Sequence, residues 1–285
     1  MALGARCTGA IFGFILAASA HACSKETFGV VIDVGHSAKS PGAVSARGTP
    51  EWRFNHNLAS LLAEELRSSG FQKVFLSSAV RSDLSLLERA ERANRLNAKL
   101  FLSIHHDSVQ KRYLTDWTHD GRRLAYSDVF SGYSLFYSGR NGDPKGSLRF
   151  ARLVGTELRR SCLTPSLHHA ERIPGEGRDL VDEQRGIFRF DDLVVLRSTK
   201  MPAILIEAGL IVNRSEEIRL TDPAYQKLLA DSIVRAINRF CQKPSGAGTA
   251  VEAKGLEETV AGAGESCPPD LPAKAERRLR FRKPL

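Results

Sequence analysis

The segment VVIDVGH, in which a short apolar run ends abruptly in glycine and histidine, most constrains the fold. The run Val30–Val34 is interrupted only by Asp33, is rich in β-branched residues and is too short for a soluble helix. Such a run predicts a strand that is buried on both faces. His36 is therefore expected just past the carboxyl end of a central strand.

The next segments alternate between helical and strand-like patterns. Residues 55–70 place leucines at helical spacing before a terminal glycine, and residues 84–98 repeat the pattern with Leu86, Ala90, Ala93 and Leu96 along one side. Strand-like runs occupy residues 73–78 and 100–104. This alternation predicts right-handed crossovers and an α/β fold, a mostly parallel twisted sheet with helices on both faces.

The second half of the chain is less regular. We expect strands at residues 132–139, 192–197 and 202–209, helices at 147–162 and from about Pro223, and a long glycine-containing loop at 171–186. Residues 107–131 are polar and aromatic and predict a surface insertion. Residues 23–242 would form one domain around this insertion.

Both ends of the chain have non-globular patterns. Arg6, an apolar run at residues 11–18 and the small residues before Cys23 predict a signal peptide over residues 1–22, cleaved after Ala22, and hence export. An alternative is a lipoprotein with Cys23 acylated, although His21 fits a lipobox poorly. Membrane attachment is disfavoured unless Cys23 is lipidated.

Residues 243–285 predict a disordered basic tail, because they contain few large apolar side chains. This tail contributes to the net charge of +9. We expect it either to keep the chain soluble or to bind an anionic surface such as cell wall, membrane or a partner through its positive charge. Nucleic acid is disfavoured as a partner, since no groove-reading motif is evident and an exported protein would seldom meet it.

Four cysteines would remain after signal cleavage. In an oxidising compartment this even number allows one or two disulfides. The sequence leaves their connectivity open. The four residues are Cys23, Cys162, Cys241 and Cys267.

Three side chains that can bind a metal ion or transfer a proton lie at or just past the ends of apolar runs. They are His36, His105 and Glu207, and the carboxyl ends of parallel strands share one edge of a sheet, where ligands bind. Glu51 opens the first predicted helix after the loop that begins at His36. Two imidazoles and a carboxylate are the ingredients of a zinc site with an open position for water.

The order of the motifs resembles the zinc-dependent N-acetylmuramoyl-L-alanine amidases of the amidase-3 (AmiC-like) family, which have an α/β fold and cleave peptidoglycan. The similar blocks occur in family order between Val30 and about Phe240. They read IDVGHSAKSPGA, EWRFNHNLA, LLERAERAN, LSIHHD and PAILIEAGLIVN. The loop after His36 has fewer glycines than is usual in the family, and Trp52 replaces a charged residue.

The resemblance implies that Zn²⁺ is held by His36, Glu51 and His105, with Glu207 as the catalytic carboxylate. It implies hydrolysis of the amide bond between N-acetylmuramic acid and L-alanine of the stem peptide, for cell-wall remodelling. With no wall-binding module evident, a periplasmic location is favoured over an extracellular one.

Other histidines compete for these roles. His106 is the rival of His105, but neighbouring strand residues face opposite sides, so only one is expected to be a ligand, and the motif selects His105. His168 and His169 are candidates for a replacement ligand or a substrate contact, with solvent exposure favoured.

Two further pairs of residues match the family blocks. Arg89 and Asn94 are expected to brace their helix against the sheet. Arg185 and Gly186 resemble a block near the substrate groove.

Two other functional classes remain open. One is a zinc peptidase or carboxypeptidase that acts on wall peptides, and the other is a non-catalytic wall-binding or regulatory protein. Retention of all four site residues argues against the second. The insertion at 107–131 is a candidate for covering the site, selecting substrate or docking a protein activator. Because related enzymes hold a blocking helix in an inserted region, self-inhibition is a further hypothesis.

Overall fold

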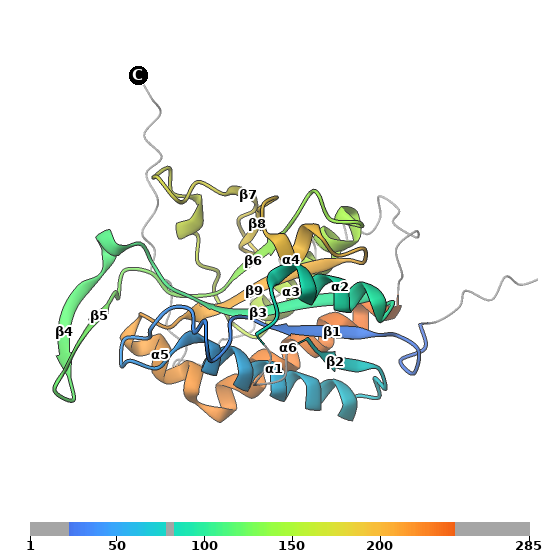
Figure 1. Cartoon of the computed structure of the whole chain (residues 1–285), viewed down its shortest axis with the longest axis horizontal. Helices are drawn as coiled ribbons and strands as arrows, with labels where there is room; N and C mark the ends of the chain where they lie inside the picture. Colours follow the sequence, from blue (N-terminus) through green and yellow to red (C-terminus); the bar gives the residue numbers. More distant parts are fainter. Residues whose placement is uncertain (1–22, 78–82, 243–285) are drawn as a thin grey trace, which may run out of the picture.

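The computed structural model describes residues 23–77 and 83–242 (Figure 1). The predicted signal peptide, residues 1–22, and the predicted basic tail, residues 243–285, lie outside these ranges. Within them, no helix combines the length and the apolar character needed to cross a membrane.

A seven-stranded sheet forms the centre of the molecule, in the order β2-β1-β3-β9-β6-β8-β7. The first four of these neighbours run parallel, β6 is antiparallel to β9 and parallel to β8, and β7 is antiparallel to β8. The predicted mostly parallel sheet is therefore confirmed. The strands are β1 Val30–Val34, β2 Val74–Leu76, β3 Leu100–Asp107, β6 Ser134–Tyr137, β7 Asp179–Asp182, β8 Ile187–Arg189 and β9 Ala203–Leu210.

Helices cover both faces of the sheet, as predicted (Figure 1). One apolar cluster joins the sheet to α1, α3 and α6, and a second cluster on the other face includes side chains of α2 and α4. The buried strand β1 contributes to both clusters, which explains its continuous apolar run. The helices are α1 Glu51–Ser68, α2 Leu86–Arg95, α3 Pro144–Arg160, α4 Val194–Arg197, α5 Arg214–Thr221 and α6 Pro223–Gln242.

Helix α2 is only partly oriented as predicted. Ala90 and Ala93 are buried, but Leu86 and Leu96 are 52% and 39% exposed. The side chain that is buried instead is Arg89, which reaches polar groups at the end of β1. The spacing of the leucines predicted the wrong buried side of α2, because the buried ion pair of Arg89 with Asp33 determines the orientation of the helix.

Two predicted elements of the second half are wrong. The run 192–197 was expected to be a strand, but Val194–Arg197 forms the short helix α4, which packs against α2. β-Branched residues favour strands only weakly, and tertiary contacts override that preference. The expected loop 171–186 contains β7, which pairs with the unpredicted strand β8. Helix α5 also had no predicted counterpart.

The insertion at residues 107–131 begins at the last residue of β3 and forms a hairpin. Strands β4, Thr115–His119, and β5, Arg122–Tyr126, pair antiparallel after the short 3₁₀ helix η1, Lys111–Tyr113. Figure 1 shows the hairpin projecting beyond the central sheet. All residues of this segment are described and none lies in an α-helix, so a self-inhibiting element here would be the hairpin rather than a helix.

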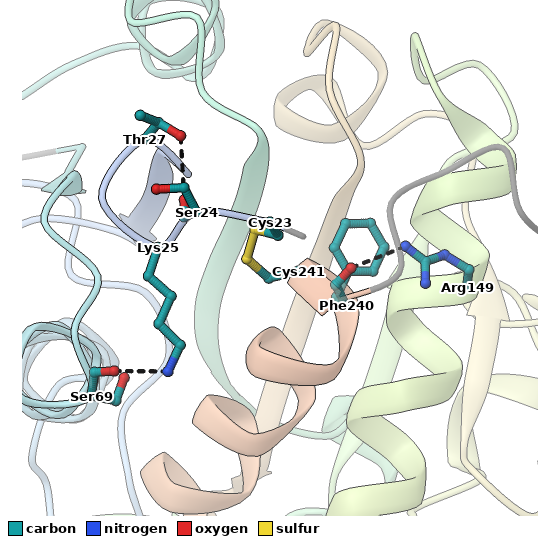
Figure 2. The surroundings of a disulfide bond; sticks show 8 residues. All are labelled: Cys23, Ser24, Lys25, Thr27, Ser69, Arg149, Phe240 and Cys241. Atoms are coloured by element: carbon teal, nitrogen blue, oxygen red, sulfur yellow. Dashed lines mark hydrogen bonds between the residues drawn. A yellow bond between two sulfur atoms is a disulfide. The ribbon is translucent and has the colours of Figure 1, made fainter. Parts of the chain in front are cut away.

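A disulfide joins Cys23 to Cys241, near the two ends of the described chain (Figure 2). Cys241 lies in the last turn of α6, and 218 residues separate the two cysteines in sequence. Lys25 Nζ donates a hydrogen bond to the Ser69 carbonyl oxygen, which attaches the same N-terminal segment to the end of α1. The connectivity that the sequence left open is thus assigned for one pair.

Replacing Cys241 by alanine should lower the free energy of unfolding by about 2–5 kcal/mol, because the unfolded chain gains the conformational freedom of a very long loop. Denaturant unfolding measures this loss. Cys23→Ala and the double variant should lose the same amount as Cys241→Ala, since a disulfide is lost as a unit. Additive losses from the two single variants would contradict this bond.

Candidate metal centre

Three of the predicted site residues meet at the carboxyl edge of the sheet. His36 follows β1, His105 lies near the end of β3, and Glu51 is the first residue of α1. Glu51 Oε2 lies 3.1 Å from His36 Nε2, and Glu51 Oε1 lies 3.0 Å from His105 Nδ1. One ligand atom from each residue lies within 4.8 Å of the others.

The loop between β1 and α1 folds back so that Glu51 can reach the two imidazoles. The backbone N–H of Glu51 donates to the Ala43 carbonyl at 2.8 Å, and the Ala43 N–H donates to Glu51 Oε2 at 3.1 Å. Asn55, one helical turn later, donates to Glu51 Oε1 at 3.1 Å and to the Gly35 carbonyl at 3.0 Å. These contacts fix the carboxylate in one orientation.

Two glycines leave space for the cluster. A Cβ atom at Gly35 would lie 2.5 Å from the imidazole of His105. A Cβ at Gly42 would collide with Glu51 Oε2 and would lie 2.6 Å from His36 Cδ2, and the φ of Gly42 is +74°. The sequence VGH and the loop glycine are therefore needed for the close approach of these side chains.

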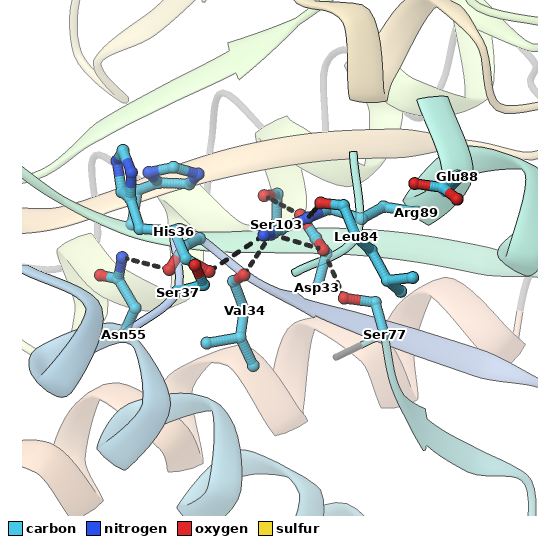
Figure 3. Close-up of polar contacts among 12 residues, drawn as sticks. Asp33, Val34, His36, Ser37, Asn55, Ser77, Leu84, Glu88, Arg89 and Ser103 are labelled. Atoms are coloured by element: carbon cyan, nitrogen blue, oxygen red, sulfur yellow. Dashed lines mark hydrogen bonds and ion pairs between the residues drawn. The ribbon is translucent and has the colours of Figure 1, made fainter. Parts of the chain in front are cut away.

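A buried ion pair holds the backbone that carries His36 (Figure 3). Arg89 of α2 donates to the carbonyls of Val34 and His36, the latter at 2.9 Å, and its Nη1 lies 3.3 Å from Asp33 Oδ1. Asp33 also accepts hydrogen bonds from the buried hydroxyls of Ser77 and Ser103. The charged residue that interrupts β1 is thus fully partnered, and the predicted bracing role of Arg89 is confirmed.

Asn94 attaches α2 to the connection between α4 and β9 and not, as was expected, to the sheet itself. Its amide donates to the Ser198 carbonyl at 2.9 Å and accepts from the Lys200 N–H at 2.9 Å.

His106 points away from the cluster that contains His105. Its Nδ1 lies 2.8 Å from Asn55 Oδ1, and its ring packs beside Phe54. Burial lowers the pKa of His106 to about 3, so the ring is neutral at physiological pH. The structure separates the two neighbouring histidines in the way that strand geometry predicts.

Glu207 lies on β9 opposite His105 of β3 in the parallel register. Its Oε2 is buried and has no hydrogen-bond partner among the described residues. Burial raises the pKa of Glu207 well above its usual value, and the nearby charges of Asp107 and Glu51 raise it further. A carboxyl group with one buried, unpartnered oxygen beside a cluster of potential ligands is a feature of a functional site.

The donor set fits a divalent metal ion. Burial alone would raise the pKa of Glu51, but hydrogen bonds with His105 and His36 hold it well below its usual range, so it is a carboxylate. Two imidazole nitrogens and one carboxylate oxygen form the ligand set of several catalytic zinc sites, which leave one position open. The roles of the individual residues stay predictions.

His168 and His169 are not exposed, which corrects the sequence-based expectation. His168 is only 3% exposed, and both imidazoles contact Asp107, the residue at the end of β3. Asp107 was not predicted as a site residue. The signal that could have identified it is its position two residues after His105 on the same strand.

Arg185 and Gly186 support the fold around β8. Arg185 is buried, and its guanidinium contacts Asp182 Oδ2 at 2.9 Å and Thr156 Oγ1 at 3.0 Å. Gly186 has a φ of +61°. Their predicted place near a substrate groove is not tested by these contacts.

A mostly parallel α/β sheet with two imidazoles and two carboxyl groups at its carboxyl edge defines a class of protein suited to metal-assisted hydrolysis. Comparison with known proteins narrows this class. Residues 30–239 match the model of the Amidase_3 family, described as N-acetylmuramoyl-L-alanine amidase, and the chain belongs to that family.

Known proteins with similar sequences or structures match this chain over most of its described length. The uncharacterized protein YqiI of Bacillus subtilis is 30% identical over 214 residues, which are 74% of this chain and 84% of that protein. The catalytic domain of CwlV, an N-acetylmuramoyl-L-alanine amidase from Bacillus (Paenibacillus) polymyxa var. colistinus, has 28% identity and a TM-score of 0.57 over 75% of this chain and 97% of that domain. The N-acetylmuramoyl-L-alanine amidase AmiC2 of Nostoc punctiforme has 27% sequence identity and a TM-score of 0.56, over 76% of this chain and 98% of that chain.

Proposed function

We propose that this N-acetylmuramoyl-L-alanine amidase hydrolyses the amide bond between N-acetylmuramic acid and L-alanine of peptidoglycan, using Zn²⁺ held by His36, Glu51 and His105. Family membership supports the amidase activity and the substrate. The observation that carries the assignment of the site is the convergence of these three side chains within 4.8 Å. The identity of the metal is part of the proposal, and it rests on the ligand set.

Glu207 is the residue suited to move the proton. When bound, Zn²⁺ would polarise the scissile carbonyl and lower the pKa of water toward about 7. The raised pKa of Glu207 matches a general base that accepts the proton of the attacking water and returns it to the leaving amine. Glu51 cannot serve both as this base and as a ligand, because both of its oxygens face the imidazoles.

A cavity beside the loop of Glu51 offers room for part of the substrate. Its volume is about 520 Å³, and Ala43, whose N–H binds Glu51, forms part of its wall. The hairpin contributes Asp116 and Arg123 to the lining of the same cavity. This lining supports a role of the insertion in selecting substrate.

Digestion of purified peptidoglycan by the full-length chain, with released fragments identified by mass spectrometry, tests the activity. We expect stem peptides with a free N-terminal alanine and a glycan without peptides, and no release after chelation. Release should return when Zn²⁺ is added back. Shortened peptides that remain attached to glycan would instead identify a wall peptidase, and an intact wall with metal bound would point to a missing activator or to inhibition by the hairpin.

The location that we propose is the periplasm, after export. The Cys23–Cys241 disulfide supports an oxidising compartment. A sulfur in a disulfide cannot also carry a thioether-linked lipid, so the same bond supports a chain without a membrane anchor at Cys23. The mass of the chain recovered from a periplasmic fraction tests this proposal: a chain that begins at Cys23 without lipid agrees with it, whereas an acylated mass contradicts it.

A further inference from the structure

A second cluster of potential ligands lies beside the candidate metal centre. It joins Asp107, at the end of β3, to His168 and His169, which open the 3₁₀ helix η2 His168–Ala170. Asp107 Oδ2 lies 2.8 Å from His169 Nε2 and 3.3 Å from His168 Nε2. One potential ligand atom from each residue lies within 4.8 Å of the others, and the cluster shares no residue with the first.

The outer nitrogen of each imidazole already has a partner. His169 Nδ1 lies 2.9 Å from Glu176 Oε2, and His168 Nδ1 lies 2.9 Å from Ser166 Oγ. An N–H at Nδ1 can donate to each of these oxygens, which leaves the lone pair at Nε2. Metal-binding histidines in proteins are oriented in this way by carboxylates and other acceptors behind them.

One of the two inner nitrogens is not satisfied by protein alone. His168 Nε2 is buried without a hydrogen-bond partner among the described residues, although it lies close to Asp107. His169 Nε2 contacts the same carboxylate oxygen, Asp107 Oδ2. Burying an unpartnered polar nitrogen costs free energy. A cation bound by the Nε2 lone pairs of both histidines and by the Asp107 carboxylate would remove that cost.

We propose that Asp107, His168 and His169 bind a second divalent transition-metal ion, with Zn²⁺ as the natural candidate. Two imidazoles and one carboxylate form a ligand set that suits first-row divalent metals of this kind. The proposal goes beyond the amidase function and does not depend on it, because it concerns ligands that the first site does not use.

The second ion would connect three parts of the chain that meet beside Glu207. Asp107 belongs to the central sheet, and the histidines belong to the connection between α3 and β7. The same connection contacts the insertion, because Gln110 Nε2 donates to the Pro174 carbonyl at 2.9 Å and Tyr113 Oη to Glu171 Oε2 at 2.9 Å. Binding would fix this connection against the edge of the sheet that carries the catalytic carboxyl.

Metal counting on the full-length chain tests the proposal. After removal of metal by chelation and dialysis against Zn²⁺, elemental analysis should give two ions per chain. His169→Ala should retain one ion, His36→Ala should retain one ion, and the double variant should retain none. A matched control is His119→Ala on the hairpin, where another imidazole lies 3.4 Å from a carboxylate, that of Asp120, outside both clusters. This control should retain two ions.

A conservative variant and a spectroscopic signal keep the test decisive if His169→Ala folds poorly. Glu176→Gln removes the negative charge behind His169 and should weaken binding of the second ion about 10–100-fold in a Zn²⁺ titration. In the His36→Ala background, Co²⁺ should give the visible absorption of imidazole and carboxylate ligands, and this absorption should be lost when His168 is also replaced.

One ion per chain, with the count unchanged in His169→Ala, would overturn the second site and leave the proposed amidase intact. The cluster would then be an ion pair between His169 and Asp107. Two ions per chain, reduced to one in His169→Ala, would support the second site whether or not the chain releases stem peptides, whereas a chain that binds one ion and shortens peptides still attached to glycan would fail both proposals.

Discussion

Glu207→Gln should lower kcat/KM for release of stem peptides about 10²–10⁴-fold, the range that a positioned general acid–base group contributes. Glutamine has nearly the same size and shape but cannot take a proton from water. Because Glu207 is not part of the cluster of His36, Glu51 and His105, the amount of bound metal should not change. A soluble peptidoglycan fragment as substrate and elemental analysis of the same preparation measure both quantities.

A stability measurement separates a catalytic role from a structural one. Glu207 Oε2 is buried and unpartnered among the described residues, so its charge costs free energy in the folded state. Replacement by a neutral amide should therefore leave the metal-free chain at least as stable as the parent in denaturant unfolding. Loss of activity together with retained stability is expected where a site residue is kept for chemistry rather than for folding.

Glu157→Gln is the matched control for this variant. Glu157 is a buried glutamate of α3 whose oxygens contact Arg235 at 3.1 Å and Arg239 at 2.7 Å. Removing its charge leaves these cations without their partner, so stability should fall while kcat/KM of the folded chain stays the same. Full activity of Glu207→Gln would show that another group accepts the proton.

The first half of the fold could be predicted from sequence because its signals are local. Residues 30–34 are apolar apart from Asp33, and residues 51–68 have a leucine stripe. Each segment takes the structure that its pattern favours. The position of the first site followed from the same patterns, since parallel strands place their carboxyl ends at one edge. Glycines at 35 and 42 then allow the close approach of His36, Glu51 and His105.

The rest depended on contacts between distant parts of the chain. Residues 194–197 form a helix because they pack against α2, which no local pattern records. The burial of His168 and His169 requires Asp107, which is about sixty residues earlier in the printed sequence. A polar segment is predicted to be exposed unless its partner is known, so the second cluster could only be found in the structure.

His105→Ala should remove both the activity and one metal ion, because it deletes a proposed ligand whose Nδ1 lies 3.0 Å from Glu51 Oε1. Loss of a ligand leaves two donors, His36 and Glu51, which is fewer than the three protein ligands of a catalytic zinc site. We expect activity below detection and one ion fewer than in the parent. The chain should remain folded, since the imidazole of His105 is only part-buried and is not in either apolar cluster.

His106→Ala is the sharpest control, because the two histidines are neighbours on one strand and differ only in the side that they face. His106 binds Asn55 Oδ1 at 2.8 Å in a buried position, so its loss leaves that oxygen unsatisfied and should cost about 1–3 kcal/mol of unfolding free energy. The metal count should equal that of the parent, because His106 is outside the cluster. If His106→Ala lost the metal and His105→Ala kept it, the ligand assignment along β3 would be reversed, and the parallel register that places His105 opposite Glu207 would no longer explain the site.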